Sequence, residues 1–271
     1  FAGALGCMPL NMPESVLVRF HAQRRIGITL RDVVHAIPYR AIQEGLLTVP
    51  KKNKKNVFNG RIIEIEGLSD LAAEQAFELT NSSAERSAAA CCISLSLEKI
   101  KKYLRSNIAL MHQLAHQGYH DSRVLEKRVR AVEHWLRKPE LLSADGTASY
   151  AATLEIDLDQ LREPLVACPN DPDDVRLLSE VAGTPVQDVF IGSCLTHIGH
   201  FRAAAEIWRQ GLFNPNVRLW ICPPTRMDYE QLKKEGLFPI FSSVGARIEP
   251  PGCSLCMGNQ VRVPDGATVF S

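Results

Sequence analysis

Residues 186–211 read VQDVFIGSCLTHIGHFRAAAEIWRQG, a short apolar run that leads through a turn containing glycine and serine into an amphipathic segment. The apolar run over 186–191 predicts a strand, and the spacing over 199–211 predicts a helix. The same order recurs downstream, with strands expected at 217–222 and 246–249 and a helix expected at 228–236. Strands that alternate with helices through short connections are typical of a parallel sheet with crossover helices. We therefore predict an α/β fold.

The chain has 271 residues, which is long enough for two domains that each have a hydrophobic core. Its least periodic stretch, near residues 138–149, contains Pro139, Asp145 and Gly146, which favour turns. We therefore predict one domain over 1–140, a linker over 141–148 and a second domain over 149–271. A strictly alternating strand at 152–158 should open the second domain.

The first predicted domain begins with a helix signal. Asn11 followed by Pro13 favours a capped first turn, which predicts helical structure over 13–20. Thr29 should cap a second helix over 30–37 that Pro38 interrupts. Apolar periodicity then predicts, in order, a strand at 60–67, a helix after Asp70 to about 77, and two long helices at 97–118 and 121–136.

Three cysteines follow predicted strands. Cys194 comes after the strand at 186–191, and Cys253 and Cys256 follow the strand at 246–249. Open α/β sheets bind ligands at the carboxyl ends of their strands, so we expect these three side chains to meet there. Three thiolates are one fewer than a closed zinc or iron–sulfur site normally uses. The set would leave one metal position open for water or substrate.

A closed zinc site is the main alternative that the residues leave open. His197 and His200 stand close after Cys194, and either imidazole could complete a Cys3His tetrahedron with Cys253 and Cys256. A chain built in this way would be a zinc-stabilised binding module without catalysis.

Nearby glycines distinguish these three cysteines from the others. Glycines at 192, 199, 252 and 258 suggest that the backbone beside Cys194, Cys253 and Cys256 approaches another group closely. Elsewhere in the chain, cysteines are expected to be small buried residues, namely Cys7, Cys91, Cys92, Cys168 and Cys222.

Glu85 is the acid that stands out in the first predicted domain. It lies in a segment of small residues over 81–90, and small side chains leave room beside a site. In the alternative interpretation, Asn81 or Ser82 caps a helix and Glu85 completes a capping box. Composition alone favours the capping interpretation.

Several stretches resemble the aconitase and isopropylmalate isomerase superfamily. Residues 191–196, IGSCLT, resemble its Gly-Ser-Cys motif, and residues 252–260, GCSLCMGNQ, resemble its Cys-x-x-Cys motif. Three further stretches, 12–20, 169–174 and 198–204, resemble a bacterial branch of the same superfamily. The resemblance covers essentially the whole chain, and it implies two aconitase-like α/β domains.

This resemblance implies a [4Fe–4S] cluster held by Cys194, Cys253 and Cys256, with a fourth iron that has no protein ligand. That iron would act as a Lewis acid on citrate or isocitrate, in a reversible dehydration to cis-aconitate. Hydration of 2-methyl-cis-aconitate would be a related reaction. The implied partner is therefore a tricarboxylic acid.

The same resemblance gives roles to polar residues. Glu85 matches the family's acid next to the open iron, where it hydrogen-bonds the iron-bound water or hydroxyl, and Asn81 matches a position beside the cluster. Further cofactor contacts are expected from residues of the cysteine motifs, namely Ser193, Thr196 and Asn259. One position departs from the family pattern, because His197 stands where these motifs usually have asparagine.

Charge gives little indication of a macromolecular partner. Lys and Arg total 31 against 30 for Asp and Glu, so the formal net charge is +1 and creates no general attraction to nucleic acid. RNA binding by the cluster-free form, an activity associated with aconitases, is a second alternative. Its support in the sequence is the short lysine-rich run at 51–55.

Location and completeness are also expectations. No apolar run approaches the roughly 18 residues that a membrane helix needs, and sparse cysteines suit a reducing compartment. We therefore predict a cytoplasmic protein. Both ends of the sequence look truncated, so we expect an internal piece of a longer polypeptide whose other domains are its partners. The piece alone should turn over substrate poorly.

Overall fold

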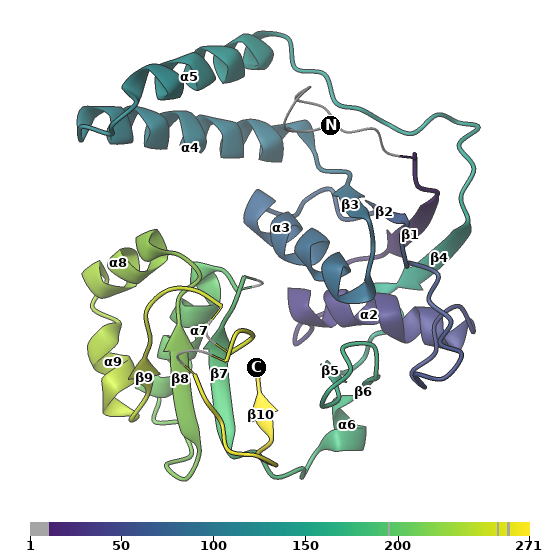
Figure 1. Ribbon diagram of the computed structural model, residues 1–271, viewed down its shortest axis with the longest axis vertical. Coiled ribbons are helices and arrows are strands. Elements are labelled where there is room, and N and C mark those ends of the chain that lie inside the picture. The colour runs from purple at the N-terminus through teal and green to yellow at the C-terminus, as the bar shows by residue number, and fades with distance from the viewer. Residues whose placement is uncertain (1–10, 195, 254, 259–260) are drawn as a thin grey trace.

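The computed structural model describes residues 11–194, 196–253, 255–258 and 261–271. Within these residues there are two four-stranded sheets, with the strand orders β3-β2-β1-β4 and β10-β7-β8-β9, and one two-stranded ribbon. Every strand pair in the two larger sheets is parallel. In Figure 1 the two sheets lie in separate parts of the molecule, with α2 (Leu30–Gln43) and α3 (Ala73–Asn81) between them. The predicted α/β class is confirmed.

The first sheet consists of β1 (Ser15–His21), β2 (Ile62–Glu66), β3 (Ala90–Ile93) and β4 (Ala152–Asp157). The helix predicted over 13–20 is wrong, because these residues form β1. Val16 pairs with Ile63 on one side and with Ala152 on the other, so β1 is a central strand. Central parallel strands are covered on both faces, so their sequences are continuous apolar runs. Periodicity alone does not distinguish such a run from a buried helix, which explains the wrong prediction.

Four helical elements follow β1 in the chain before β4: α2, α3 with its extension η1 (Ser82–Arg86), α4 (Leu97–His116) and α5 (Ser122–Arg137). Thr29 caps α2 as predicted, but the predicted interruption at Pro38 is wrong, since α2 continues to Gln43. The buried side chains of Ile37, Pro38 and Ala41 lie in this helix. Their packing outweighs the hydrogen bond that proline cannot donate. The two long predicted helices are confirmed as α4 and α5, which form the hairpin at the top of Figure 1.

β4 does not open a second domain. It pairs with β1 from Val16–Ala152 to His21–Asp157, so the strand that we assigned to the second domain belongs to the first sheet. The chain then forms η2 (Leu158–Gln160), the ribbon of β5 (Leu165–Ala167) and β6 (Val175–Leu177), and α6 (Leu178–Val181). The division into domains stays a prediction, but its boundary must fall after β4 because strand pairing joins β4 to β1.

The second sheet confirms the predicted alternation of strands and helices. It consists of β7 (Asp188–Gly192), β8 (Arg218–Cys222), β9 (Arg247–Ile248) and β10 (Val269–Phe270), with helices α7 (Ile198–Arg209), α8 (Arg226–Lys234) and α9 (Phe238–Ser243). Phe201 of α7, Ile221 of β8, Leu232 of α8 and Phe241 of α9 are fully buried in one cluster. This packing holds the second sheet, in which the cysteine motifs follow β7 and β9.

Among the residues that the structure describes, no helix is both long enough and apolar enough to cross a membrane.

Candidate functional site

The turn that carries Cys194 is built by its neighbours. β7 ends at Gly192, and Ser193 adopts a left-handed conformation with φ of 86°. The Thr196 hydroxyl donates a hydrogen bond to the Gly192 carbonyl, and the Thr196 amide donates to the Ser193 carbonyl at 3.2 Å. Cys194 itself is exposed. Thr196 therefore closes a tight turn that presents the Cys194 thiol at the end of the strand.

Gly192 is required by the neighbouring strand. A Cβ atom at this position would lie 2.6 Å from the Cys222 carbonyl oxygen and 2.7 Å from the Phe190 ring. At Gly199 the close group is the His197 imidazole, 2.6 Å from an added Cβ. At Gly192 and Gly199 the backbone therefore does approach another group closely, as we inferred, but that group is part of the protein.

The Cys253 turn is anchored by the next strand. The buried Cys222 thiol at the end of β8 lies 3.2 Å from the Pro250 carbonyl oxygen and 3.1 Å from that of Gly252. The Glu249 amide also donates to the Ile221 carbonyl at 2.8 Å. These contacts fix the segment that leads into Cys253 and Cys256, both of which are exposed. Cys222 is therefore buried as predicted, and it has a structural role. The same prediction is wrong for Cys92, which is exposed, and Cys91 and Cys168 are only half-buried. Cys7 lies outside the residues that the structure describes.

The exposed Cys256 lies within electrostatic range of Cys253, Cys194 and Glu85. Burial raises the pKa of the Cys256 thiol, and the negative charges of Cys253, Cys194 and Glu85 raise it further. Cys256 thus lies within electrostatic range of two other segments, which carry Cys194 and Glu85. The expected meeting of the three cysteines at one site stays a prediction.

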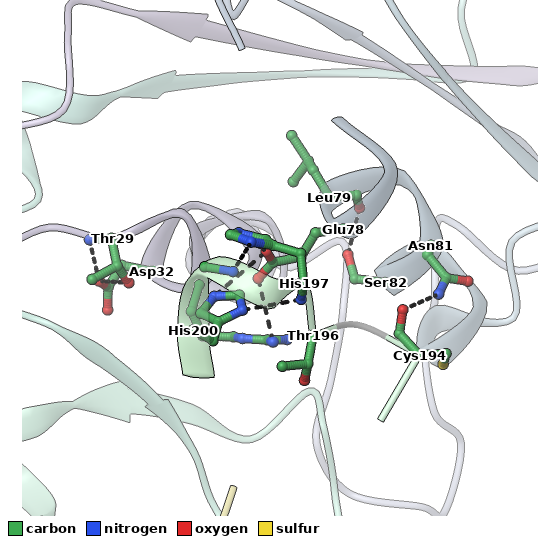
Figure 2. Close-up of polar contacts among 12 residues, drawn as sticks. Thr29, Asp32, Glu78, Leu79, Asn81, Ser82, Cys194, Thr196, His197 and His200 are labelled. Atoms are coloured by element: carbon green, nitrogen blue, oxygen red, sulfur yellow. Dashed lines mark hydrogen bonds and ion pairs between the residues drawn. The ribbon is translucent and has the colours of Figure 1, made fainter. Parts of the chain in front are cut away.

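Asn81 and Glu85 lie in α3 and η1, the helical segments that connect β2 and β3 of the first sheet. Asn81 ends α3, and its side-chain amide donates a hydrogen bond to the Cys194 carbonyl at 3.4 Å (Figure 2). Glu85 is exposed on η1, while the neighbouring Arg86 is buried and donates to the Ser82 carbonyl at 2.9 Å. Arg86 also lies 3.9 Å from Asp173. These buried contacts hold the short helix that presents Glu85.

The capping interpretation of Glu85 is wrong. α3 runs directly into η1, and no side chain caps η1 through a hydrogen bond. The Ser82 hydroxyl instead donates to the Leu79 carbonyl at 2.6 Å. Because the helix continues through Asn81 and Ser82, the segment contains no first turn for a capping box to close.

The arrangement also bears on the kind of metal group that the thiols could hold. Among the described residues, the three cysteines do not form a group whose ligating atoms all lie within 4.8 Å of one another. A closed tetrahedral zinc site, with zinc–sulfur bonds of about 2.3 Å, would hold its sulfurs about 4 Å apart. A cubane cluster binds each thiolate through a different iron and needs wider spacing. Three exposed thiols, one of them within electrostatic range of an acid, suit the cluster by their chemistry, and the ligand assignment stays a prediction.

Sequence reasoning missed a second polar group at the same junction. Glu78 of α3 has a side chain that is 2% exposed, and it faces two histidines at the start of α7. His197 Nε2 lies 3.5 Å and His200 Nε2 lies 3.7 Å from Glu78 Oε2, and Arg31 lies 3.3 Å from Oε1. These residues are far apart in the chain, and no spacing rule connects them.

Burial dominates the charge states of this group. It raises the pKa of Glu78, against the opposing effect of Arg31 and Arg24. It lowers the pKa of His197, and it lowers the pKa of His200 to about 4 with a further contribution from His197. Both imidazoles are therefore neutral near pH 7.

Ser193 and Asn259 are the remaining predicted site residues. Ser193 supplies the left-handed position of the Cys194 turn. Asn259 lies outside the residues that the structure describes. The structure therefore places Asn81 and Thr196 at the Cys194 turn and Glu85 within electrostatic range of Cys256, and the roles that we predicted for them remain predictions.

Known proteins show similarity over the whole chain. The aconitase family (aconitate hydratase) matches residues 4–185 and 179–271. Aconitate hydratase B of Salmonella typhimurium and of Escherichia coli are each 60% identical over 271 residues, which is 100% of this chain and 31% of the relative. The large subunit of 3-isopropylmalate dehydratase from Desulfatibacillum aliphaticivorans is 41% identical over 129 residues, which is 47% of this chain and 30% of the relative.

Proposed function

This chain belongs to the aconitase family, and on that premise we propose that it provides the iron–sulfur site of a hydro-lyase that interconverts citrate and isocitrate through cis-aconitate. The chain spans 31% of the length of the relatives named aconitate hydratase B. The proposed activity is therefore that of the whole polypeptide, in which other domains would complete the substrate site.

One observation carries the proposal. Cys194, Cys253 and Cys256 are exposed, and Cys256 lies within electrostatic range of the other two thiols and of Glu85. Three thiolates suit a [4Fe–4S] cluster that keeps one iron for substrate. An acid beside that position suits proton transfer to an oxygen that leaves as water.

The roles of the chain's own residues follow from this arrangement. When bound, the cluster would supply a Lewis acid that polarises the substrate hydroxyl. Cys194, Cys253 and Cys256 would hold it as thiolates. Glu85 would hold the proton that the departing hydroxyl needs, and in the reverse direction it would accept a proton from water. Asn81 would orient the Cys194 turn through the carbonyl that it already contacts.

Two finer assignments belong to the same proposal. We infer 2-methyl-cis-aconitate as a second substrate for hydration, because it differs from cis-aconitate by one methyl group. We also infer a cytoplasmic location, since the proposed cluster depends on reduced thiols and cytosolic proteins rarely form disulfides.

The alternatives have less support. A Cys3His zinc site would need His197 or His200 to face the cysteines, but the Nε2 atoms of both rings face Glu78. RNA binding would rely on the lysine-rich run at 51–55, and Lys54 in that run donates a hydrogen bond to Asp173 at 2.7 Å. Much of the positive charge of Lys54 is therefore neutralised within the protein.

The test is the activity of the complete protein after anaerobic reconstitution with iron and sulfide. We expect interconversion of citrate and isocitrate, and a loss of about 100-fold or more in kcat for Glu85→Gln with cluster content unchanged. Glu126→Gln on α5 is the matched control, because Glu126 is also exposed but lies on the hairpin away from the cysteines. Full activity of Glu85→Gln would contradict the proposed role of this acid.

A further inference from the structure

Two segments that carry candidate site residues meet at a buried acid. Glu78 lies one turn before Asn81 on α3, and the two histidines that face it begin α7, directly after the Cys194 turn (Figure 2). The carboxylate oxygens of Glu78 are buried and have no hydrogen-bond partner within the described structure. A buried carboxylate is costly unless nearby groups compensate its charge, so its neighbours need explanation.

The backbone fixes which nitrogen of each histidine carries the proton. The Gly199 amide donates to His197 Nδ1 at 3.0 Å, and the His197 amide donates to His200 Nδ1 at 3.2 Å. A neutral imidazole that accepts at Nδ1 must carry its proton on Nε2. In both rings Nε2 is the atom that faces Glu78. Two N–H groups therefore point toward the buried carboxylate.

The same backbone contacts argue against a metal at this place. Glu78, His197 and His200 do offer three ligating atoms within 4.8 Å of one another. A metal-bound histidine, however, uses the lone pair of one nitrogen and donates the N–H of the other. Here the outer nitrogens already accept from backbone amides, so coordination through Nε2 would break the cap at the start of α7. The two histidines are therefore better suited to donate to the Glu78 carboxylate than to bind a metal ion together with it.

We propose that Glu78, His197 and His200 form a clamp that positions the Cys194 turn against α3 and η1, and so sets the place of the Cys194 thiol relative to Asn81 and Glu85. This inference rests on the proposed function. These are positioning residues, since none of them is one of the proposed cluster ligands. The Asn81 hydrogen bond to the Cys194 carbonyl is a second link between the same two segments, and it depends on the same alignment.

The two histidine nitrogens can be tested separately. Asparagine places a polar atom near the position of Nδ1, so His197→Asn and His200→Asn keep an acceptor for the backbone cap but remove the N–H that faces Glu78. Glutamine places an amide N–H near the position of Nε2, so His197→Gln and His200→Gln keep the donor to Glu78. His116→Asn and His116→Gln, at the end of α4, are the matched controls.

The first readout is hydrogen exchange in the complete protein without its cluster. For the His197→Asn/His200→Asn double variant we expect exchange about 10-fold faster at the Thr196 amide, which donates within the Cys194 turn. The His197→Gln/His200→Gln variant should exchange close to the wild-type rate. Equal exchange in the two double variants and the wild type would overturn the clamp. This readout needs neither cluster nor activity, so it decides the clamp even where the proposed function fails.

The second readout is steady-state kinetics of the reconstituted protein. The asparagine double variant should lose about 10-fold in kcat with KM unchanged, and the glutamine double variant should recover most of that loss. A glutamine double variant that loses activity while the asparagine double variant keeps the wild-type kcat would show that only the helix cap matters, which overturns the clamp. Zinc bound tightly by the cluster-free wild-type protein, and lost in Glu78→Gln, would replace the clamp with a metal site.

Discussion

Substitution of Gly192 by alanine should destabilise the part of the chain that carries all three candidate ligands. An added Cβ would lie 2.6 Å from the Cys222 carbonyl oxygen, 3.0 Å from the Cys222 Cβ and 2.7 Å from the Phe190 ring. The first two atoms belong to a neighbouring strand in fixed register, with Gly192 paired to Cys222, so they cannot move alone. Overpacking of this kind costs about 3 kcal/mol. A gain of about 0.5 kcal/mol from the stiffer unfolded chain offsets part of it.

We therefore expect Gly192→Ala to lower the free energy of unfolding by about 2 to 3 kcal/mol. Urea unfolding followed by tryptophan fluorescence is a suitable assay, because Trp220 is buried in β8 and pairs with Phe190, two residues before the substitution. Gly146→Ala is the matched control, since an added Cβ there meets nothing within 4 Å and the backbone is not left-handed. The control should be unchanged or slightly stabilised. A Gly192→Ala protein within about 0.5 kcal/mol of the wild type would refute this reasoning.

Three further predictions concern single side chains. Asp32 accepts hydrogen bonds from the Thr29 amide at 2.7 Å and the Leu165 amide at 2.8 Å, so Asp32→Ala should cost about 3 kcal/mol in urea unfolding, and a cost below about 1 kcal/mol would contradict this. Burial lowers the pKa of His35 from 6.5 to about 4, so the unfolded state binds the proton more readily and stability should fall by about 2 kcal/mol between about pH 7.5 and pH 5. His35→Gln should flatten that part of the pH profile, and an unchanged profile would contradict the assignment. Glu85→Ala should abolish turnover but leave iron content at the wild-type level, and iron loss would instead indicate a structural role.

The second sheet could be predicted from the sequence because its pattern is local. Each strand there is a short apolar run followed by a turn and an amphipathic helix, and such units form parallel sheets with few alternatives. The expected meeting of Cys194 with Cys253 and Cys256, which stays a prediction, then follows from the rule that the carboxyl ends of parallel strands share one edge. These expectations needed no knowledge of contacts between distant segments.

The errors arose where distant contacts decide the structure. Residues 15–21 read as a helix start because Asn11 and Pro13 precede an apolar run, but pairing with β2 and β4 on both sides makes this segment a strand. The strand Ala152–Asp157 was assigned to the wrong unit for the same reason, since its partner is β1. Periodicity reports which face of a segment is buried, and it carries no information about the partner that buries it.

The junction at Glu78 could not be predicted for a related reason. In the sequence Glu78 is one of several acids on an amphipathic helix, and His197 and His200 appeared as spare zinc ligands beside Cys194. Their actual contact requires α3 and the start of α7 to lie together. Only the backbone amides that donate to the Nδ1 atoms show that both rings present N–H groups to the acid.

The central claim is that Cys194, Cys253 and Cys256 hold an iron–sulfur cluster, and a count of iron and labile sulfide per chain after anaerobic reconstitution tests it most directly. We expect about four irons and four sulfides in the wild type, a large loss in Cys194→Ser, and no loss in the control Cys168→Ser. One tightly bound zinc without sulfide, or equal iron content in Cys194→Ser and the wild type, would contradict the account.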